Sequence, residues 1–250
     1  LAAMAVRLNT LAQGYSGASV ELIKALKKRI NDRIIPIVPE HGAVGTSGDL
    51  VQLAHIALAL IGEGEVSYQG KRQKTLPLLR HLKIAPYTLK PKEGLSLING
   101  ASFASGIAAL LCVDLRHLLG TAIRSGALAL EVMHGFKDSI SKELHELRPH
   151  HGQKMVALRL RQITTGSDRI KERKELSYSV ENGEDIKDLE SAVQDVYSLR
   201  CIPQILGPVW EMLERVIEDV EVEINSVTDN PVVGRKERAF LHGGNFHGDY

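Results

Sequence analysis

Apolar residues recur along the chain at the spacing of α-helices. Leu22, Leu26 and Ile30 lie four residues apart and Ile23 falls on the same face, which is typical of a helix that buries one side. The same criterion predicts helices at residues 1–13, 50–61, 76–83, 101–135 and 156–163, and from Pro208 to a break at 225–231. There is no internal repeat and no regular alternation of strands and helices. The pattern therefore predicts a mainly α protein.

Capping and turn residues predict where these helices begin and end. Ser16 or Ser19 can cap the second helix, and Asp49 is predicted to cap the helix that follows it. Pro208 is predicted to begin the last long helix, because its missing N–H costs nothing in the first turn. The buried face of that helix is then expected to consist of Val209, Met212, Leu213, Val216 and Val220. A Gln69-Gly70 turn predicts a small hairpin within residues 66–74.

The most apolar stretch raises the question of a membrane span. Residues 94–113 carry no formal charge and are long enough to cross a bilayer. However, serines, glycines and Asn99 interrupt the stretch, and Asp114 and Arg116 follow it at once, so we interpret it as part of a buried helix in a soluble protein. Apolar residues cover much of that helix's circumference, so we expect neighbouring elements to bury it on several sides: Ile107, Leu110, Leu111, Leu115, Leu118 and Leu119.

Charge and composition then exclude several classes of protein. The 250 residues include 31 basic and 30 acidic side chains, a net charge of +1, which argues against a nucleic-acid binder or a polybasic membrane binder. Two cysteines exclude a disulfide-stapled scaffold and fit a cytoplasmic location. The charged segment 167–190 is predicted to be exposed. The chain begins at Leu1 inside a predicted helix and ends without a closing element, so we expect a single helical core, residues 1–250, that is a piece of a longer chain.

The glycine-rich connection at 42–48 is the most unusual local feature. It lacks the Gly-Lys-Ser/Thr of a phosphate loop. It also lacks the Gly-x-Ser-x-Gly of a nucleophile elbow, because its second glycine comes one residue early, at Gly48. From these residues alone, a flexible turn with Asp49 as a helix cap is the plain interpretation.

Two other clusters could carry chemistry. Gln194, Tyr197 and Arg200 follow each other at intervals of three, so on one helical turn they would share a face. An amide, a phenol and a guanidinium together suit a carboxylate, although an ordinary surface triplet is equally consistent with this spacing. The histidines at 145, 150 and 151 are interrupted by Pro149 and match no metal-binding spacing, so no metal site is predicted.

Six ordered motifs together carry a family resemblance. They are Gly45-Thr46-Ser47-Gly48-Asp49-Leu50, Leu97-Ile98-Asn99-Gly100, Arg148-Pro149-His150-His151-Gly152-Gln153, Gln194 to Gln204, Glu223 to Pro231, and Gly243-Gly244-Asn245-Phe246-His247-Gly248. This set resembles the aromatic amino acid ammonia-lyases, which act on histidine, phenylalanine or tyrosine, and the related aminomutases. The resemblance implies a bundle of long, nearly parallel helices of the fumarase/aspartase-like architecture.

The resemblance also implies a cofactor made from the chain itself. In the family, a small-Ser-Gly tripeptide cyclises to a methylideneimidazolone (MIO), an electrophile. Here the Gly48 nitrogen would attack the Thr46 carbonyl, and Ser47 would lose its hydroxyl to become a methylene. Gly48 suits this step because a side chain would hinder the approach. Thr46 differs from the commoner alanine and also occurs among aminomutases.

Further site residues follow from the resemblance, one position at a time. Asn99 resembles the asparagine that hydrogen-bonds near the ring, and Arg200 resembles the residue that binds the substrate carboxylate. Gln194 and Tyr197 resemble flanking polar residues of the pocket, with Tyr197 assigned to the catalytic group. Phe246 resembles the phenylalanine that packs beside the ring.

The implied function is elimination of ammonia from an aromatic α-amino acid to give an α,β-unsaturated acid. The family's tyrosine base would precede Leu1 and an acidic pocket residue would follow Tyr250, so the 250 residues alone are expected to be inactive. Family sites are built from several subunits, which implies a homotetramer. Two alternatives stay open: an aminomutase that yields a β-amino acid, and a non-catalytic helical assembly module.

Overall fold

A computed structural model describes residues 1–172, 194–234, 236 and 238–248. The chain divides into two compact units, one formed by Leu1–Leu111 and Ile217–Tyr250, the other by Cys112–Val216. Each unit is described by itself. Most of the predicted charged segment, from residue 173 to 190, lies outside the described residues.

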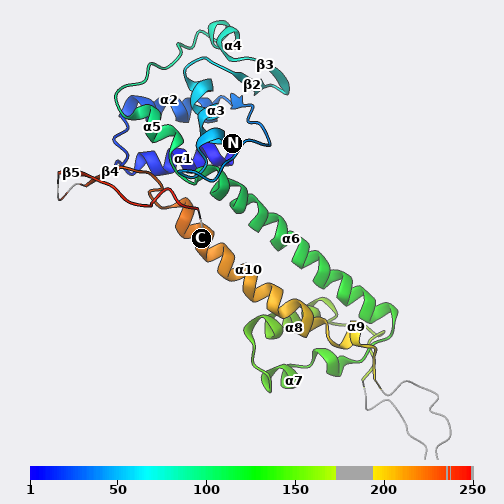
Figure 1. Ribbon diagram of the computed structural model, residues 1–250. Coiled ribbons are helices and arrows are strands. Elements are labelled where there is room, and N and C mark those ends of the chain that lie inside the picture. The colour runs from blue at the N-terminus through cyan, green and yellow to red at the C-terminus, as the bar shows by residue number, and fades with distance from the viewer. Residues whose placement is uncertain (173–193, 235, 237, 249–250) are drawn as a thin grey trace, which may run out of the picture. The chain divides into compact units, whose positions relative to one another are not determined.

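Packed helices form the core of the first unit (Figure 1). Its complete helices are α1 (Ala2–Ala12), α2 (Val20–Asn31), α3 (Leu50–Leu60), α4 (Thr75–His81) and α5 (Glu93–Ile98). Leu11, Leu22 and Leu53, from α1, α2 and α3, are fully buried together. The predicted amphipathic stripe of α2 is confirmed by the burial of Leu22 and Leu26, and Ser19, rather than Ser16, caps that helix.

The first unit also contains two small antiparallel sheets. β1 (Ile35–Pro36), β2 (Glu65–Tyr68) and β3 (Lys71–Lys74) form an antiparallel sheet in that order. The β2–β3 hairpin turns at Gln69-Gly70 with Tyr68 opposite Lys71, as predicted. A second pair, β4 (Val232–Gly234) and β5 (Ala239–Leu241), places Val233 opposite Phe240.

The second unit is also mainly helical. It contains a short 3-10 helix, Lys137–Ile140, followed by α7 (Lys142–Glu146), α8 (His151–Ile163) and α9 (Tyr197–Arg200). Val156, Ala157 and Leu160 on α8 are completely buried, which confirms the predicted helix there. Gly126 approaches Ile202 closely: a β-carbon on this glycine would lie 3.1 Å from the isoleucine side chain.

Two long helices each contribute to both units: α6 (Ser102–Val132) and α10 (Ile202–Ile224). The prediction that Pro208 begins α10 is wrong, because the helix starts six residues earlier and Pro208 lies inside it. Pro203, which is buried, takes the first-turn position that tolerates a missing N–H. Of the predicted buried face of α10, Leu213 is buried, but Val209, Met212 and Val216 are exposed.

The expected burial of α6 on several sides is also wrong within this chain. Ser102 and Ser105 at its start and Ile123 and Leu130 toward its end are buried. In its middle, Cys112 and the predicted Leu119 are buried, but most of the apolar residues are exposed: Ile107, Leu110, Leu111, Val113, Leu115 and Leu118. Among the described residues, α6 is the helix long and apolar enough to cross a membrane. Apolar surface of this extent on a helix is typical of an interaction face, because it finds no cover in the part of the chain that is described.

A buried carboxylate ties α5 to the start of α2. Glu93 is almost completely buried, and its Oε1 accepts hydrogen bonds from the Ser19 backbone N–H at 3.1 Å and the Ser19 hydroxyl at 2.6 Å. Its Oε2 accepts from the Lys90 N–H at 2.7 Å and the Tyr87 hydroxyl at 3.0 Å. Burial by itself would raise the pKa of Glu93, but these hydrogen bonds together outweigh it and lower the pKa below 4.5.

We therefore predict that Glu93 contributes pH-dependent stability. A carboxyl whose folded pKa is lowered stabilises the fold above its unfolded pKa, and this contribution is lost as the pH falls below 4.5 toward the folded pKa. The Glu93→Gln variant should lose about 1–3 kcal/mol at neutral pH and show a flatter acid limb. Urea denaturation followed by circular dichroism across this pH range measures both. Equal acid limbs for variant and parent would contradict the prediction.

Candidate functional site

The glycine-rich loop is held against the end of α5 by its backbone. The Gly100 N–H donates to the Ser47 carbonyl at 3.3 Å, and the Asp49 N–H donates to the Gly100 carbonyl at 2.9 Å. Gly48 and Gly100 thereby form an isolated parallel bridge. Ser47 has φ +54°, a left-handed conformation that non-glycine residues rarely adopt. The loop is thus bent at Ser47 and bonded to Gly100 through the backbone of Ser47 and Asp49.

Both glycines of this bridge are needed because of close backbone approach. A β-carbon on Gly48 would lie 2.4 Å from the Gly100 carbonyl oxygen and 2.7 Å from the Phe246 carbonyl oxygen. A β-carbon on Gly100 would lie 2.0 Å from the Thr228 carbonyl oxygen. Both glycines also have positive φ, +77° and +142°. No larger residue fits either position without moving the backbone around it.

Asp49 performs a different task from the predicted one. It stands at the N-cap position of α3, but its side chain makes no capping bond there. Instead, Asp49 Oδ2 accepts hydrogen bonds from the Phe103 N–H at 2.8 Å and the Ala104 N–H at 2.9 Å. These are free N–H groups in the first turn of α6. The carboxylate therefore joins the glycine-rich loop to the positive end of a 31-residue helix.

Asn99 lies behind this loop with one polar atom unused. Its side chain is 3% exposed, and its Nδ2 donates to the Asn230 carbonyl. Because a carbonyl oxygen can only accept, the amide must turn its nitrogen toward Asn230. Asn99 Oδ1 is buried and has no hydrogen-bond partner among the residues that the structure describes. A buried acceptor left free in this way is available to a donor group of a ligand.

A cavity of about 470 Å³ opens directly on the loop. Its lining consists of Gly45 to Asp49, Ala101, Ala104 and Phe246 to Gly248. Phe246 is half-buried, and its backbone carbonyl faces Gly48. The structure therefore brings Thr46, Ser47, Gly48 and Phe246 together around one cavity, with Asn99 next to Gly100 behind it.

The predicted carboxylate-binding residues form a second cluster, in the other unit. The Arg200 guanidinium lies 4.5 Å from the centre of the Tyr197 ring, and its Nη1 donates to Gln194 Oε1 at 2.6 Å. The three side chains do lie together, although Gln194 precedes α9 rather than sharing it. Arg200 Nε is buried without a partner within the described residues. Gln194 and Arg200 line a cavity of about 510 Å³, together with Asp138, Ser139, Ser141, Asp195 and Gln204 among others.

Of the histidines at 145, 150 and 151, His145 uses its ring for hydrogen bonding. His145 is buried, with its Nε2 3.0 Å from the Ser139 carbonyl oxygen and its Nδ1 2.9 Å from Gln153 Nε2. Burial lowers the pKa of the His145 imidazole. In the described part of the chain, no group of three His, Cys, Asp or Glu residues is arranged to hold a metal ion.

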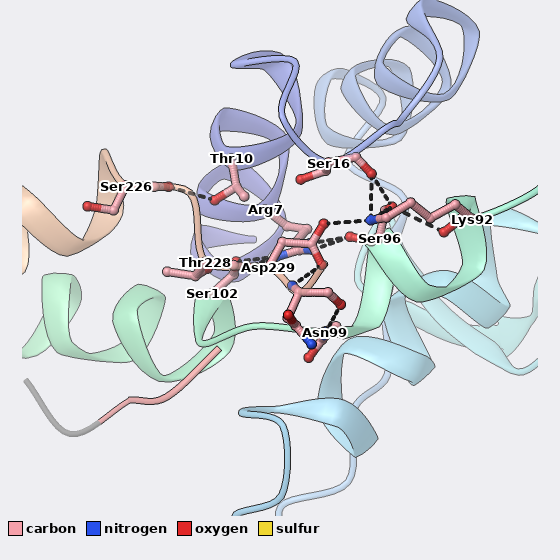
Figure 2. Close-up of polar contacts among 11 residues, drawn as sticks. Arg7, Thr10, Ser16, Lys92, Ser96, Asn99, Ser102, Ser226, Thr228 and Asp229 are labelled. Carbon is pink, nitrogen blue, oxygen red and sulfur yellow. Dashed lines mark hydrogen bonds and ion pairs between the residues drawn. The ribbon is translucent and has the colours of Figure 1, made fainter. Parts of the chain in front are cut away.

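A buried ionic cluster next to Asn99 was missed by the sequence reasoning. Asp229 is completely buried; its Oδ2 lies 3.1 Å from Lys92 Nζ, and its Oδ1 lies 4.0 Å from Arg7 Nη2 (Figure 2). One signal could have found Arg7: it falls on the same face of α1 as the buried Met4 and Leu11. Asp229 lies within the quoted motif from Glu223 to Pro231, and Lys92 precedes the motif that starts at Leu97, but neither had an assigned role.

Similarity to solved structures defines the class of protein. The tyrosine aminomutase of Streptomyces globisporus matches 99% of this chain with a TM-score of 0.92 and 36% sequence identity, and the match covers 47% of that chain. The predicted helical ammonia-lyase architecture is therefore confirmed.

Sequence relatives define the family. The probable histidine ammonia-lyase of Thermoplasma acidophilum is 42% identical over 248 residues, which are 99% of this chain and 47% of the relative. The tyrosine 2,3-aminomutase of Chondromyces crocatus is 40% identical over 253 residues, 100% of this chain and 48% of the relative. The aromatic amino acid lyase family model matches residues 1–250, and the chain belongs to this family. It spans about half the length of the curated relatives it matches.

The Asp49 geometry predicts a measurable stability difference. Asp49→Ala removes both acceptor bonds to α6 and should cost about 1–2 kcal/mol of unfolding free energy. Asp49→Asn keeps an oxygen acceptor and should cost less. The matched control is Asp32→Ala, which removes a surface pair with Lys28 and should cost at most about 0.5 kcal/mol. Urea denaturation compares the three variants. If Asp49→Ala costs no more unfolding free energy than Asp32→Ala, Asp49 does not stabilise the first turn of α6.

Proposed function

We propose that this chain is the ring-forming part of an ammonia-lyase that acts on an aromatic α-amino acid. The observation that carries the proposal is the Thr46-Ser47-Gly48 segment, bent at Ser47 and pressed by its backbone against Gly100. The relatives are named as histidine ammonia-lyases and tyrosine aminomutases, which supports an amino acid as the substrate.

The residues present fit a self-formed methylideneimidazolone. Ring closure needs the Gly48 nitrogen to reach the Thr46 carbonyl carbon, and the left-handed Ser47 bends the chain between these two residues. The free Asn99 Oδ1 supplies a buried acceptor close to the segment, which suits the amino group of a substrate, because the closed ring carries no N–H of its own. When formed, the ring would supply an electrophilic carbon, the chemistry that amino acid side chains lack.

The other residues would bind and orient the substrate. Arg200 would hold the substrate carboxylate by paired hydrogen bonds, steadied by Gln194 and by the Tyr197 ring beneath it. Asn99 would accept a hydrogen bond beside the reacting centre, and Phe246 would flank the loop. The positive end of α6, bound by Asp49, would favour negative charge that develops near the loop.

The overall reaction breaks the Cα–N bond and a Cβ–H bond. Ammonia leaves with the electron pair of the C–N bond, a base takes the β-proton, and the remaining pair forms the double bond of an α,β-unsaturated acid. We infer that a tyrosine outside this chain is the base, so the 250 residues alone would not turn over substrate. An aminomutase, which returns ammonia to the β-carbon, is the second candidate, favoured by Thr46 and by the aminomutase relatives.

The exposed middle of α6 supports a face that further chain segments cover in the working form, which we propose to be the homotetramer implied by the family resemblance. Ile107, Leu110 and Leu118 are 47%, 58% and 64% exposed, and large apolar faces of this kind are covered in stable oligomers. A cytoplasmic location belongs to the same proposal, and two free cysteines fit it.

Ring formation and turnover can be tested together in the full-length enzyme. Loss of two waters should lower the intact mass by about 36 Da and create an ultraviolet chromophore. Ser47→Ala has no hydroxyl to eliminate, so it should show the unreduced mass and lose essentially all activity. The matched control is Thr46→Ala, which should still close the ring because Thr46 contributes only its carbonyl.

The products then separate the two candidates. Chromatography of a reaction with histidine, phenylalanine or tyrosine should detect an unsaturated acid and ammonia from a lyase, and a β-amino acid from an aminomutase. An unmodified Thr-Ser-Gly in a full-length protein that lacks both activities would refute the proposed function.

A further inference from the structure

The ionic cluster of Arg7, Lys92 and Asp229 is the most deeply buried group of charges in the first unit (Figure 2). Asp229 and Arg7 are both completely buried, and the Lys92 side chain is 15% exposed. Burial lowers the pKa of Arg7 from 12.5 to about 10, while the carboxylates of Asp229 and Asp49 oppose the shift. The guanidinium therefore stays charged at neutral pH.

Every donor nitrogen of the two cations has a defined acceptor. Arg7 Nε donates to the Ser96 carbonyl at 2.8 Å, and Nη2 donates to the same oxygen. Arg7 Nη1 donates to the Thr228 carbonyl at 2.8 Å and reaches Ser102 Oγ at 3.4 Å. Lys92 Nζ donates to the Ser16 carbonyl at 2.7 Å and to Ser96 Oγ at 3.1 Å. The cluster thus connects α1, α5, the start of α6 and the 228–230 segment.

The 228–230 segment connects the ionic cluster to Asn99 and Gly100. Asp229 Oδ1 accepts from the Asn230 N–H at 2.7 Å, which fixes the peptide between them. The Asn230 carbonyl then accepts from Asn99 Nδ2, and the Thr228 carbonyl lies against Gly100. Gly100 in turn makes both backbone bonds to Ser47 and Asp49. An unbroken path of contacts therefore leads from the buried charges to the ring-forming loop.

Stability alone is a weak explanation for these charges. Desolvation offsets much of the attraction within a buried ion pair, and an apolar replacement of similar volume is often as stable. The charges instead fix the orientation of backbone carbonyls, because each carbonyl that accepts a hydrogen bond from a cation must point at its donor. One of these directed carbonyls, that of Thr228, meets Gly100. Asp229 holds the Asn230 N–H, and the carbonyl of the same residue accepts from Asn99.

We propose that Arg7, Lys92 and Asp229 are positioning residues for ring formation and for Asn99. Through the Thr228–Asn230 segment they hold Asn99 with Oδ1 free and keep Gly100 pressed against Ser47-Gly48. The inference rests on the proposed function and adds to it three residues that touch neither the loop nor the substrate pocket. Weakening the cluster leaves the helices folded but allows the Ser47-Gly48 segment to move away from Gly100.

The test uses Asp229→Asn in the full-length enzyme. This variant keeps the shape but leaves both cations without their carboxylate. On soluble protein with unchanged helical content, intact mass measures the fraction that has lost two waters. We expect this fraction, or kcat per ring-bearing subunit, to fall about tenfold to a hundredfold, because an ångström of misplacement has effects of that size. KM should change far less than kcat.

Lys92→Met is the milder companion variant. It removes the nearer of the two cations at a partly exposed position and should shift both readouts in the same direction, by a smaller factor. If Asp229→Asn fails to fold, Lys92→Met decides the proposal by itself.

Glu93→Gln is the matched control. Glu93 is an equally buried carboxylate at the start of the same helix, α5, but it bonds to Ser19, Tyr87 and the Lys90 backbone and not to the 228–230 segment. It should lose stability while keeping the dehydrated mass and kcat. A loss of ring formation in Glu93→Gln equal to that in Asp229→Asn would mean that general destabilisation is the cause, and would overturn the proposal.

The remaining outcomes separate this inference from the proposed function. A parent protein without the mass loss refutes the ring itself, whatever the variants do. A parent that carries the ring, together with Asp229→Asn and Lys92→Met variants that keep full dehydration and parental kcat, refutes the positioning role and leaves the proposed function standing.

Discussion

The backbone contact between Gly48 and Gly100 is the constraint around which the first unit is arranged. Two chain segments approach so closely that a β-carbon on either glycine would collide with a carbonyl oxygen. Such an approach is maintained only where the surrounding structure holds both segments from behind. On one side, Asp49 is bonded to the first turn of α6. On the other side, Asn99 and Gly100 rest on the carbonyls of Thr228 and Asn230.

Charged side chains that do not line the cavity orient the backbone behind the loop. Arg7, from α1, and Lys92, from α5, both face Asp229, which follows α10. Elements far apart in the sequence therefore meet at one buried carboxylate, and each contributes a directed donor or acceptor. Glu93 joins α5 to α2 in a comparable way but leaves the loop untouched. The first unit thus contains one buried carboxylate that holds helices together and one that also orients the segment behind the loop.

Several features of the fold followed from local pattern. The periodic stripe of α2 and the Gln69-Gly70 hairpin depend on neighbours in the sequence, and the structure confirms them. The helix that contains Pro208 was misplaced because a proline inside a helix and one at its start look alike locally. The middle of α6 was expected to be buried, since apolar periodicity says that a face will be covered but not by which chain.

The candidate site, like the fold, could be predicted from the sequence only in part. The sequence by itself predicted the loop residues Thr46, Ser47 and Gly48, the neighbouring Asn99 and the Gln194, Tyr197 and Arg200 cluster as site residues, through the family resemblance of its ordered motifs. Only the tertiary structure decided that Asp49 bonds to α6 rather than to its own helix, and that Arg7, Lys92 and Asp229 converge behind Asn99. The physical reason is that a buried charge is satisfied by partners scattered along the chain, and no local pattern records which of them will meet.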